Sequence, residues 1–145
     1  MLTFNKARAK FYPYNEVYLE APKKATNLPE GSPTKHQYVR LDSYVPNKEI
    51  VSRKYTQLSE VSEETAIRYL KELSDKYAPE TKIADVPSNI SGANAGIFKE
   101  NRGRTLRGQM ILEVPVQDKV VPRRVIDYAN KHYIKIRDIN GKIYN

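Results

Sequence analysis

Cysteine and tryptophan are absent from this 145-residue chain, and histidine occurs only twice, at His36 and His132. Without cysteine the chain can form neither a disulfide framework nor a thiolate metal site. Two histidines also argue against a zinc centre built mainly from histidine ligands. No apolar run approaches the roughly 18 residues that a membrane span needs, and the first residues do not have the pattern of a signal peptide. Disulfide-rich and transmembrane classes are therefore excluded from the sequence-based expectations.

Acidic residues are also few compared with basic ones. Lysine and arginine total 25 against 17 aspartates and glutamates, which gives a formal net charge of +8. Such an excess favours an anionic partner, most often nucleic acid and less often an anionic membrane or an acidic protein. A merely basic protein without such a partner is the alternative. The length fits one domain with a hydrophobic core.

Residues 36–58 are the part of the chain around which we expect the rest to be organised. Two runs rich in β-branched and aromatic residues flank a break at residues 46–48, so the segment predicts a β-hairpin. With a three-residue loop, Val45 pairs with Glu49. The register of all other pairs in the hairpin follows from that one.

In this register one face of the hairpin gathers polar side chains. Asp42 lies opposite Ser52, and Lys54 follows one step along, opposite Arg40. Packing alone would not select a carboxylate, a hydroxyl and two cations for one patch. The structural alternative is a solvated cross-strand ion pair between Asp42 and Lys54, worth well under about 1 kcal/mol.

The remaining patterns predict an α/β (α+β) fold with a mixed central β-sheet and flanking helices. Residues 1–35 read as a lead-in with a strand near residues 17–19 and a loop near residues 27–33, and residues 36–145 as the core. The apolar spacing after Ser62 predicts a helix to Tyr77. A buried strand (110–116), a helix opened by Pro122, and a strand (134–137) with an Asn140-Gly141 turn follow. A helix between the hairpin and a buried strand favours a right-handed crossover.

Glu113 interrupts the apolar strand at residues 110–116. A carboxylate in a buried strand needs a cation, a metal or a hydrogen-bonding partner. The sequence alone does not choose among these three.

Residues 85–109 show the least regular pattern of the chain. Four of its six glycines fall here, beside four basic residues: Lys99, Arg102, Arg104 and Arg107. Glycine lets a backbone approach phosphates closely, and arginine binds them, so we expect this segment to contact nucleic acid. A solvated, flexible loop is the alternative.

The order of these motifs resembles the core of the PD-(D/E)xK nucleases, which have the restriction-endonuclease fold. Asp42 matches the family's aspartate and Lys54 its lysine, whereas Ser52 stands where the family has an acid; Gln57 resembles an additional glutamine of some branches. LDSYVP, EIVSRK and RGQMILEVPVQ also resemble the nuclease domains of bacterial polymorphic and contact-dependent inhibition toxins. The resemblance spans residues 39–117.

This resemblance implies a metal-dependent nuclease, that is, a phosphodiesterase acting on DNA or RNA. Asp42 would bind Mg²⁺ or another divalent cation, with Glu49 or Glu113 as the second ligand, and Lys54 would activate water and stabilise charge. Arg40 and Arg53 would join the basic residues of segment 85–109 in binding nucleic acid. The resemblance further implies a toxic effector domain, delivered into a target cell as part of a larger protein and neutralised by an acidic immunity protein.

Two other functions remain open from the sequence. A non-catalytic nucleic-acid-binding module would use its tyrosines as stacking platforms, namely Tyr12, Tyr14, Tyr18, Tyr38, Tyr44 and Tyr55. A metal-independent ribonuclease would use His36 with Lys54 or Arg40 as acid and base. Three different outcomes distinguish these functions. The metal-dependent nuclease cleaves only with a divalent cation, the binding module binds without cleavage, and the metal-independent ribonuclease cleaves in the presence of chelator.

Overall fold

The computed structural model describes residues 2–21 and 38–145. Five strands form one sheet in the order β1-β2-β3-β4-β5: β1 (Tyr14–Glu20), β2 (Tyr38–Val45), β3 (Glu49–Arg53), β4 (Gln109–Val114) and β5 (Ile134–Asp138). Within the described residues the helices are α1 (Leu2–Ala9), α3 (Glu63–Lys76), α4 (Pro87–Ile90), η1 (Gly92–Asn94), α5 (Ile97–Glu100) and α6 (Arg123–Lys131).

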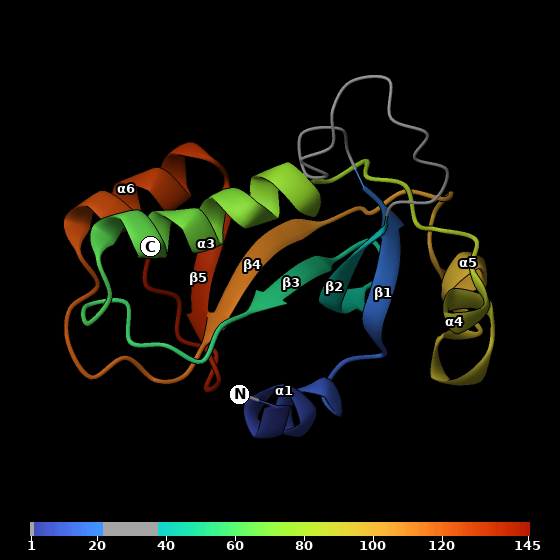
Figure 1. Cartoon of the computed structure of the whole chain (residues 1–145), viewed down its shortest axis with the longest axis horizontal. Coiled ribbons are helices and arrows are strands. Elements are labelled where there is room, and N and C mark those ends of the chain that lie inside the picture. Colours follow the sequence, from blue (N-terminus) through green and yellow to red (C-terminus); the bar gives the residue numbers. More distant parts are fainter. Residues whose placement is uncertain (1, 22–37) are drawn as a thin grey trace.

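The sheet is mixed, as predicted. β1 pairs with β2 and β2 with β3 in antiparallel fashion, whereas β3, β4 and β5 are parallel. Parallel neighbours need a crossover connection, and α3 and α6 lie in the two connections (Figure 1). Val45 pairs with Glu49 and Ser43 with Val51, so the predicted hairpin register is confirmed next to the turn, but the pairing stops before the predicted Asp42–Ser52 pair.

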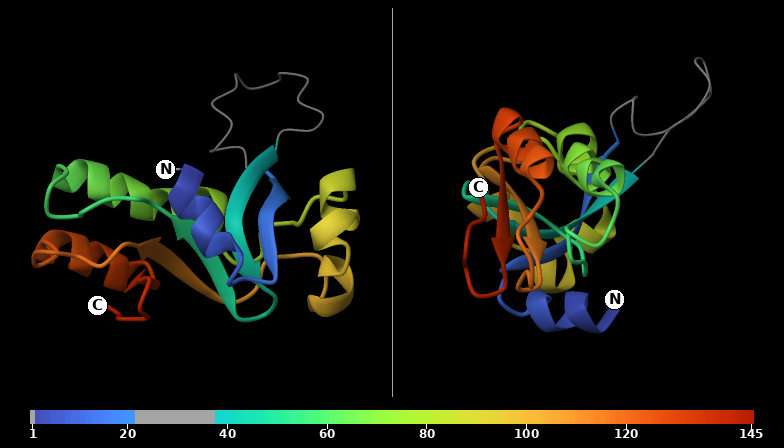
Figure 2. Two further views of the ribbon diagram at one scale, coloured as in Figure 1. Left: turned by 90° about the horizontal axis from the view of Figure 1, so that it is seen from below. Right: turned by 90° about the vertical axis from the view of Figure 1, so that its left-hand side faces the viewer.

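Helices α3 and α6 cover one face of the sheet, and α1 lies against the other (Figures 1 and 2). The core lies beneath α3 and α6, where Leu70, Leu73 and Leu112 are fully buried. Ser62 accepts the Thr65 backbone N–H and caps α3, as its sequence predicts. Burial of large apolar side chains on this face supplies the main drive for folding.

The segment at residues 85–109 is more regular than its composition predicts. It contains three short helical pieces at the β1 end of the sheet (Figure 1). Buried asparagines hold it: Asn89 bonds the backbone of Tyr18, Asn94 that of Asn15, and Asn101 the hydroxyl of Tyr44. Because these amides satisfy backbone groups that a long loop would leave unpaired, the expectation of a structureless segment is wrong.

The N-terminal residues contribute two elements of the domain. β1 is an edge strand of the sheet, in agreement with the strand expected near residues 17–19. Helix α1 was not predicted, because its residues lack an apolar stripe. The loop expected near residues 27–33 and His36 of the metal-independent alternative lie outside the described residues. None of the described helices is long and apolar enough to cross a membrane.

Candidate functional site

The chemistry predicted from the hairpin converges where β2 and β3 separate. Their pairing runs from Val45↔Glu49 through Ser43↔Val51 and stops there. At the next position the Asp42 carboxylate accepts the backbone N–H of Arg53 at 2.7 Å, in place of a ladder bond. β2 then continues along β1, and β3 along β4. We call this divergence the fork.

A hollow of about 610 Å³ opens beside the fork. Its lining comes from α1 and the first three strands: Asn5, Lys6, Ala9, Asn15, Glu16, Arg40, Asp42 and Arg53. Three of these side chains are cationic and two are carboxylates. Of the predicted site residues, the structure thus brings Asp42, Arg40 and Arg53 together around one concave surface.

Glu16 is the second carboxylate of the hollow. The β1–β2 register pairs Asn15 with Ser43 and Val17 with Leu41, which places Glu16 opposite Asp42. Glu16 has a φ of 51°, a conformation that non-glycine residues rarely adopt and that costs about 1–3 kcal/mol. Within the described part of the chain, its exposed side chain makes no hydrogen bond or salt bridge. Strain and an unpaired carboxylate beside Asp42 make this position a candidate for function.

Asp42 sits in an environment that disfavours its charged form. Burial raises the pKa of its carboxyl, and the charge of Glu72 raises it further; the Arg53 N–H and the charges of Arg53 and Lys54 only partly oppose this. The net direction is upward. A cation bound at the carboxylate would reverse that direction.

Lys54 follows β3 at the fork and faces α3 rather than the hollow. Its ammonium lies 3.2 Å from the Glu72 carboxylate and 5.3 Å from the centre of the Tyr69 ring. The structural alternative, an ion pair between Lys54 and Asp42, is therefore not formed. The predicted position of Lys54 opposite Arg40 is wrong, because β3 ends at Arg53. The charge of Lys54 still acts on Asp42 and lowers its pKa.

Ser52 and Gln57 do not line the hollow. Ser52 is buried on the α3 face, where its neighbour on β4 is Leu112. Gln57 donates to the Val116 carbonyl and accepts the N–H of Asp118, so it fixes the segment after β4.

Glu113 belongs to a charged network on the α1 face of the sheet, the face opposite to the one that carries Ser52. Its two oxygens accept hydrogen bonds from Arg53 at 2.6 Å, from Arg8 at 3.3 Å, and from the Tyr12 hydroxyl. Burial alone would raise the pKa of Glu113, but the hydrogen bonds from Arg8, Tyr12 and Arg53 lower it below its ordinary value. The expectation that this carboxylate needs a partner is confirmed.

The same network includes Glu49, which forms a bidentate ion pair with Arg137 at 2.9 and 3.0 Å. Arg137 also donates to the Tyr12 hydroxyl. Because arginines already occupy the oxygens of Glu49 and Glu113, neither carboxylate is placed to share a cation with Asp42. Their predicted role as metal ligands finds no support in this geometry.

The basic residues Lys99, Arg102, Arg104 and Arg107 are exposed, and their segment packs against the turn of the hairpin. The Arg102 N–H donates to the side chain of Asn47, and the Cβ of an alanine at Gly108 would lie 2.4 Å from the Lys48 carbonyl carbon. Three residues of β2, Ser43 to Val45, or about 10 Å of strand, separate this turn from Asp42 at the fork.

No family model, no curated protein and no solved structure matches this chain. Among the described residues, no group of three or more histidine, aspartate or glutamate side chains could hold a metal ion. A cation in the hollow would be bound by Asp42 and Glu16, and its other ligands would have to be water molecules or oxygens of a substrate.

Sequence reasoning missed Glu16, Glu72 and Arg8, and it named Tyr12 only as a stacking platform, not as a partner of Glu113. No local pattern marks them, because each acquires its place only when α1, β1 and α3 dock on the hairpin. The one available signal was Glu113, whose position in an apolar strand required a cationic partner somewhere in the chain.

The buried network predicts how stability responds to Glu113→Gln. Removing one member of a buried ion pair should reduce the free energy of unfolding by about 3 kcal/mol near neutral pH. A carboxylate whose pKa is lowered in the folded state stabilises it above the unfolded-state pKa of about 4.3, and this contribution disappears as the pH falls through the folded-state value. The difference between parent and variant in urea unfolding should therefore shrink below about pH 4. An equal change for the exposed Glu60→Gln would contradict this assignment.

Proposed function

We propose that this protein is a metal-dependent nuclease whose active site is the hollow at the fork. The observation that carries the proposal is the placement of Asp42. It occupies the point where two strands diverge, opposite Glu16, in a concave surface with cationic side chains. A concave site that combines carboxylates with cations suits a phosphodiester, whose hydrolysis requires charge neutralisation.

The order of elements supports the resemblance to the restriction-endonuclease fold. A hairpin carrying Asp42 and Lys54 is followed by α3, and α3 leads to the buried strand β4, parallel to β3. This is the order on which the resemblance to PD-(D/E)xK nucleases rests. The departure at Ser52 is offset by Glu16, which supplies a carboxylate from β1 instead of β3.

The residues of the hollow fit a magnesium ion of the kind that nucleic acid enzymes use. Mg²⁺ prefers oxygen ligands and is commonly bound by one or two carboxylates together with substrate phosphates. Asp42 and Glu16 would hold it. When bound, the ion would lower the pKa of a water molecule and stabilise charge on the leaving oxygen.

The protein's own cations would position the substrate. Arg40 and Lys6 line the hollow and can contact the phosphates on either side of the scissile one. Arg53 is fixed by Glu113 and Ser43, so it provides a rigid positive charge. Lys54 acts from the α3 side and would stabilise the developing negative charge across Asp42.

The wider biological role is proposed from the resemblance. We propose that the chain is the toxic effector domain of a bacterial competition system and acts inside a target cell. An acidic immunity protein would be its partner, in keeping with the net charge of +8.

The assignment of the metal ligands is tested with Asp42→Asn and Glu16→Gln. Asparagine keeps an acceptor for the Arg53 N–H but loses the charge, so stability should change little. Cleavage of plasmid or total RNA in Mg²⁺ should fall by roughly two or more orders of magnitude. The cleavage rate of the parent should also fall as the pH is lowered, because the raised pKa of Asp42 means that this ligand becomes protonated at a higher pH than an ordinary aspartate.

Glu20→Gln is the matched control, because Glu20 lies on β1 but pairs with Lys82 outside the hollow. Full activity of the Asp42 variant, or cleavage by the parent that persists in chelator, would refute the proposed site. Binding of nucleic acid without cleavage would instead support the non-catalytic module.

The role of Lys54 is tested against a lysine with the same partner. Lys54 and Lys76 both pair with Glu72, at 3.2 and 3.5 Å, and their side chains are 31% and 34% exposed. Of these two lysines, only Lys54 is close enough to lower the pKa of Asp42. Lys54→Met should reduce the cleavage rate at least tenfold while Lys76→Met leaves it unchanged, and both should melt alike. Equal activities in the two variants would show that Lys54 serves only in the ion pair with Glu72 and has no part in cleavage.

The basic segment predicts a dependence of binding on salt. Replacing Arg102, Arg104 and Arg107 together by alanine should weaken binding and reduce the slope of log affinity against log salt by about three at most. Fluorescence anisotropy of a labelled duplex over a salt series measures both. A triple variant that matches the parent at every salt concentration would show that this segment does not contact phosphates.

A further inference from the structure

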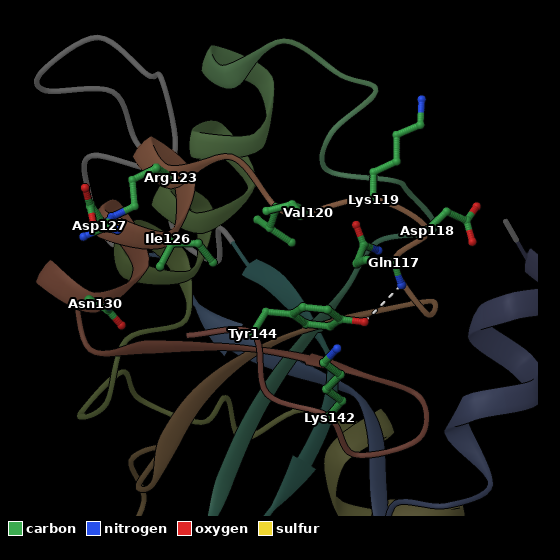
Figure 3. A pocket seen from close by; sticks show the side chains of 11 residues that line it. Gln117, Asp118, Lys119, Val120, Arg123, Ile126, Asp127, Asn130, Lys142 and Tyr144 are labelled. Carbon is green, nitrogen blue, oxygen red and sulfur yellow. Dashed lines mark hydrogen bonds and ion pairs between the residues drawn. The ribbon is translucent and has the colours of Figure 1, made fainter.

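A second cavity, of about 770 Å³, lies at the carboxyl ends of β4 and β5 (Figure 3). Its lining comes from the segment after β4, from α6 and from the turn after β5: Gln117, Asp118, Lys119, Val120, Val121, Arg123, Ile126, Asp127, Asn130, Lys142 and Tyr144. None of these residues has a part in the proposed catalytic site. We call it the Tyr144 pocket.

The Tyr144 pocket offers a fixed aromatic surface opposite apolar side chains. The Tyr144 ring lies across from Val120 and Ile126 (Figure 3). Its hydroxyl donates to Asp138 at 2.7 Å and accepts the N–H of Gln117 at 3.0 Å, so the ring is held before any ligand arrives. Val120 is 89% exposed, although it is apolar. A flat, partly apolar ligand would cover it.

Cations border this apolar space. Lys119 and Lys142 line the pocket and, among the described residues, form no salt bridge. Arg123 is paired with Asp127 at 3.1 Å. Lys142 lies 5.1 Å from the centre of the Tyr144 ring. A ligand that combines a flat aromatic group with a negative charge fits this chemistry, and a nucleotide has both.

The pocket and the fork lie at the same edge of the sheet, because the parallel strands β3, β4 and β5 all end there. Gln117 donates to the Thr56 carbonyl at 3.0 Å and accepts the N–H of Leu58 at 2.8 Å. Gln57, which fixes the same segment, follows Lys54 by three residues, a span of at most about 11 Å. That span runs from the residue after β3 to a residue that bonds Asp118 of the pocket lining, and a stacked strand covers it with roughly three nucleotides at about 3.4 Å each. One strand of several nucleotides can therefore lie along this edge of the sheet.

We infer that the Tyr144 pocket binds an unpaired base of the nucleic acid strand whose phosphate occupies the fork. The inference rests on the proposed nuclease function and specifies its substrate class as single-stranded or looped nucleic acid. Bases in a duplex are paired and stacked, so their faces are not available to a protein ring. An unpaired base stacks on Tyr144, and Lys119 and Lys142 contact its phosphates.

The test places a charge on the apolar wall. Val120→Asp repels a nucleotide without removing a packed side chain, and Val116→Asp is the matched control, since Val116 is also exposed and precedes the pocket in the same segment. With a single-stranded oligonucleotide as substrate, Val120→Asp should raise KM roughly tenfold or more and leave kcat and Tm unchanged. The control should match the parent, and a duplex of the same sequence should be the poorer substrate.

Amide chemical shifts provide a readout that does not depend on cleavage. Adding the oligonucleotide or adenosine monophosphate to the full chain should shift the amides around Tyr144 in the parent and in Asp42→Asn, but not in Val120→Asp. Such shifts without any cleavage would uphold the pocket and refute the nuclease. The pocket assignment would be refuted, and the nuclease assignment kept, by cleavage that depends on Asp42 together with either of two results. One is that the amides around Tyr144 do not shift; the other is that Val120→Asp and Val116→Asp have equal KM values.

Discussion

The buried ion pair between Arg53 and Glu113 is the interaction on which the candidate site depends. It joins β3 to β4 at 2.6 Å, and Glu113 also binds Arg8 and Tyr12, which come from the N-terminal segment. Arg53 in turn presents its backbone N–H to Asp42. The Glu113 carboxylate thus connects three features of the structure: the packing of α1 on the sheet, the position of β3, and the Asp42 side chain at the fork. Apolar burial under α3 and α6 drives folding, but this pair sets where the charges lie.

The fork converts a sheet into a site. In a continuous ladder, the backbone groups near Asp42 would be consumed by strand pairing and its side chain would pack against neighbours. Here the ladder ends, one ladder bond is replaced by the Asp42 carboxylate, and Glu16 adopts a strained conformation on the other side. Strain of this kind persists only where the surrounding structure holds it, and it concentrates at functional positions.

Periodicity predicted most of the fold. The hairpin register, the Ser62 cap and the buried strand around Leu112 all follow from local patterns, since period two and period 3.6 are properties of neighbouring residues. Helix α1 was not predicted because the contacts that hold it are those of Arg8, Asn5 and Phe4, which do not form an apolar stripe. The regular structure of residues 85–109 was not predicted because buried asparagine side chains stabilise it, and no local sequence pattern marks an asparagine as buried.

The site was predicted only in part, and for a related reason. Asp42 could be singled out because a hairpin register is a local property. The partner of Lys54 could not, because Glu72 approaches it from a helix nearly twenty residues later in the chain. The same holds for Glu49 and Glu113, whose cations come from Arg137, Arg53 and Arg8. Carboxylates suggested by sequence as metal ligands can be claimed by arginines that only the tertiary structure brings near.

The polar attachment of α1 has a consequence for the motions of the protein. The helix borders the hollow through Asn5, Lys6 and Ala9, and it is held by the hydrogen bonds of Arg8 and Asn5 and by one ring contact, that of Phe4 with Tyr55. Segments with few buried apolar contacts open locally at a small fraction of the global unfolding free energy. The amides of α1 should therefore exchange with solvent long before those of β4. The hollow would open transiently at its α1 wall, while the strands that carry Asp42 and Arg53 remain folded.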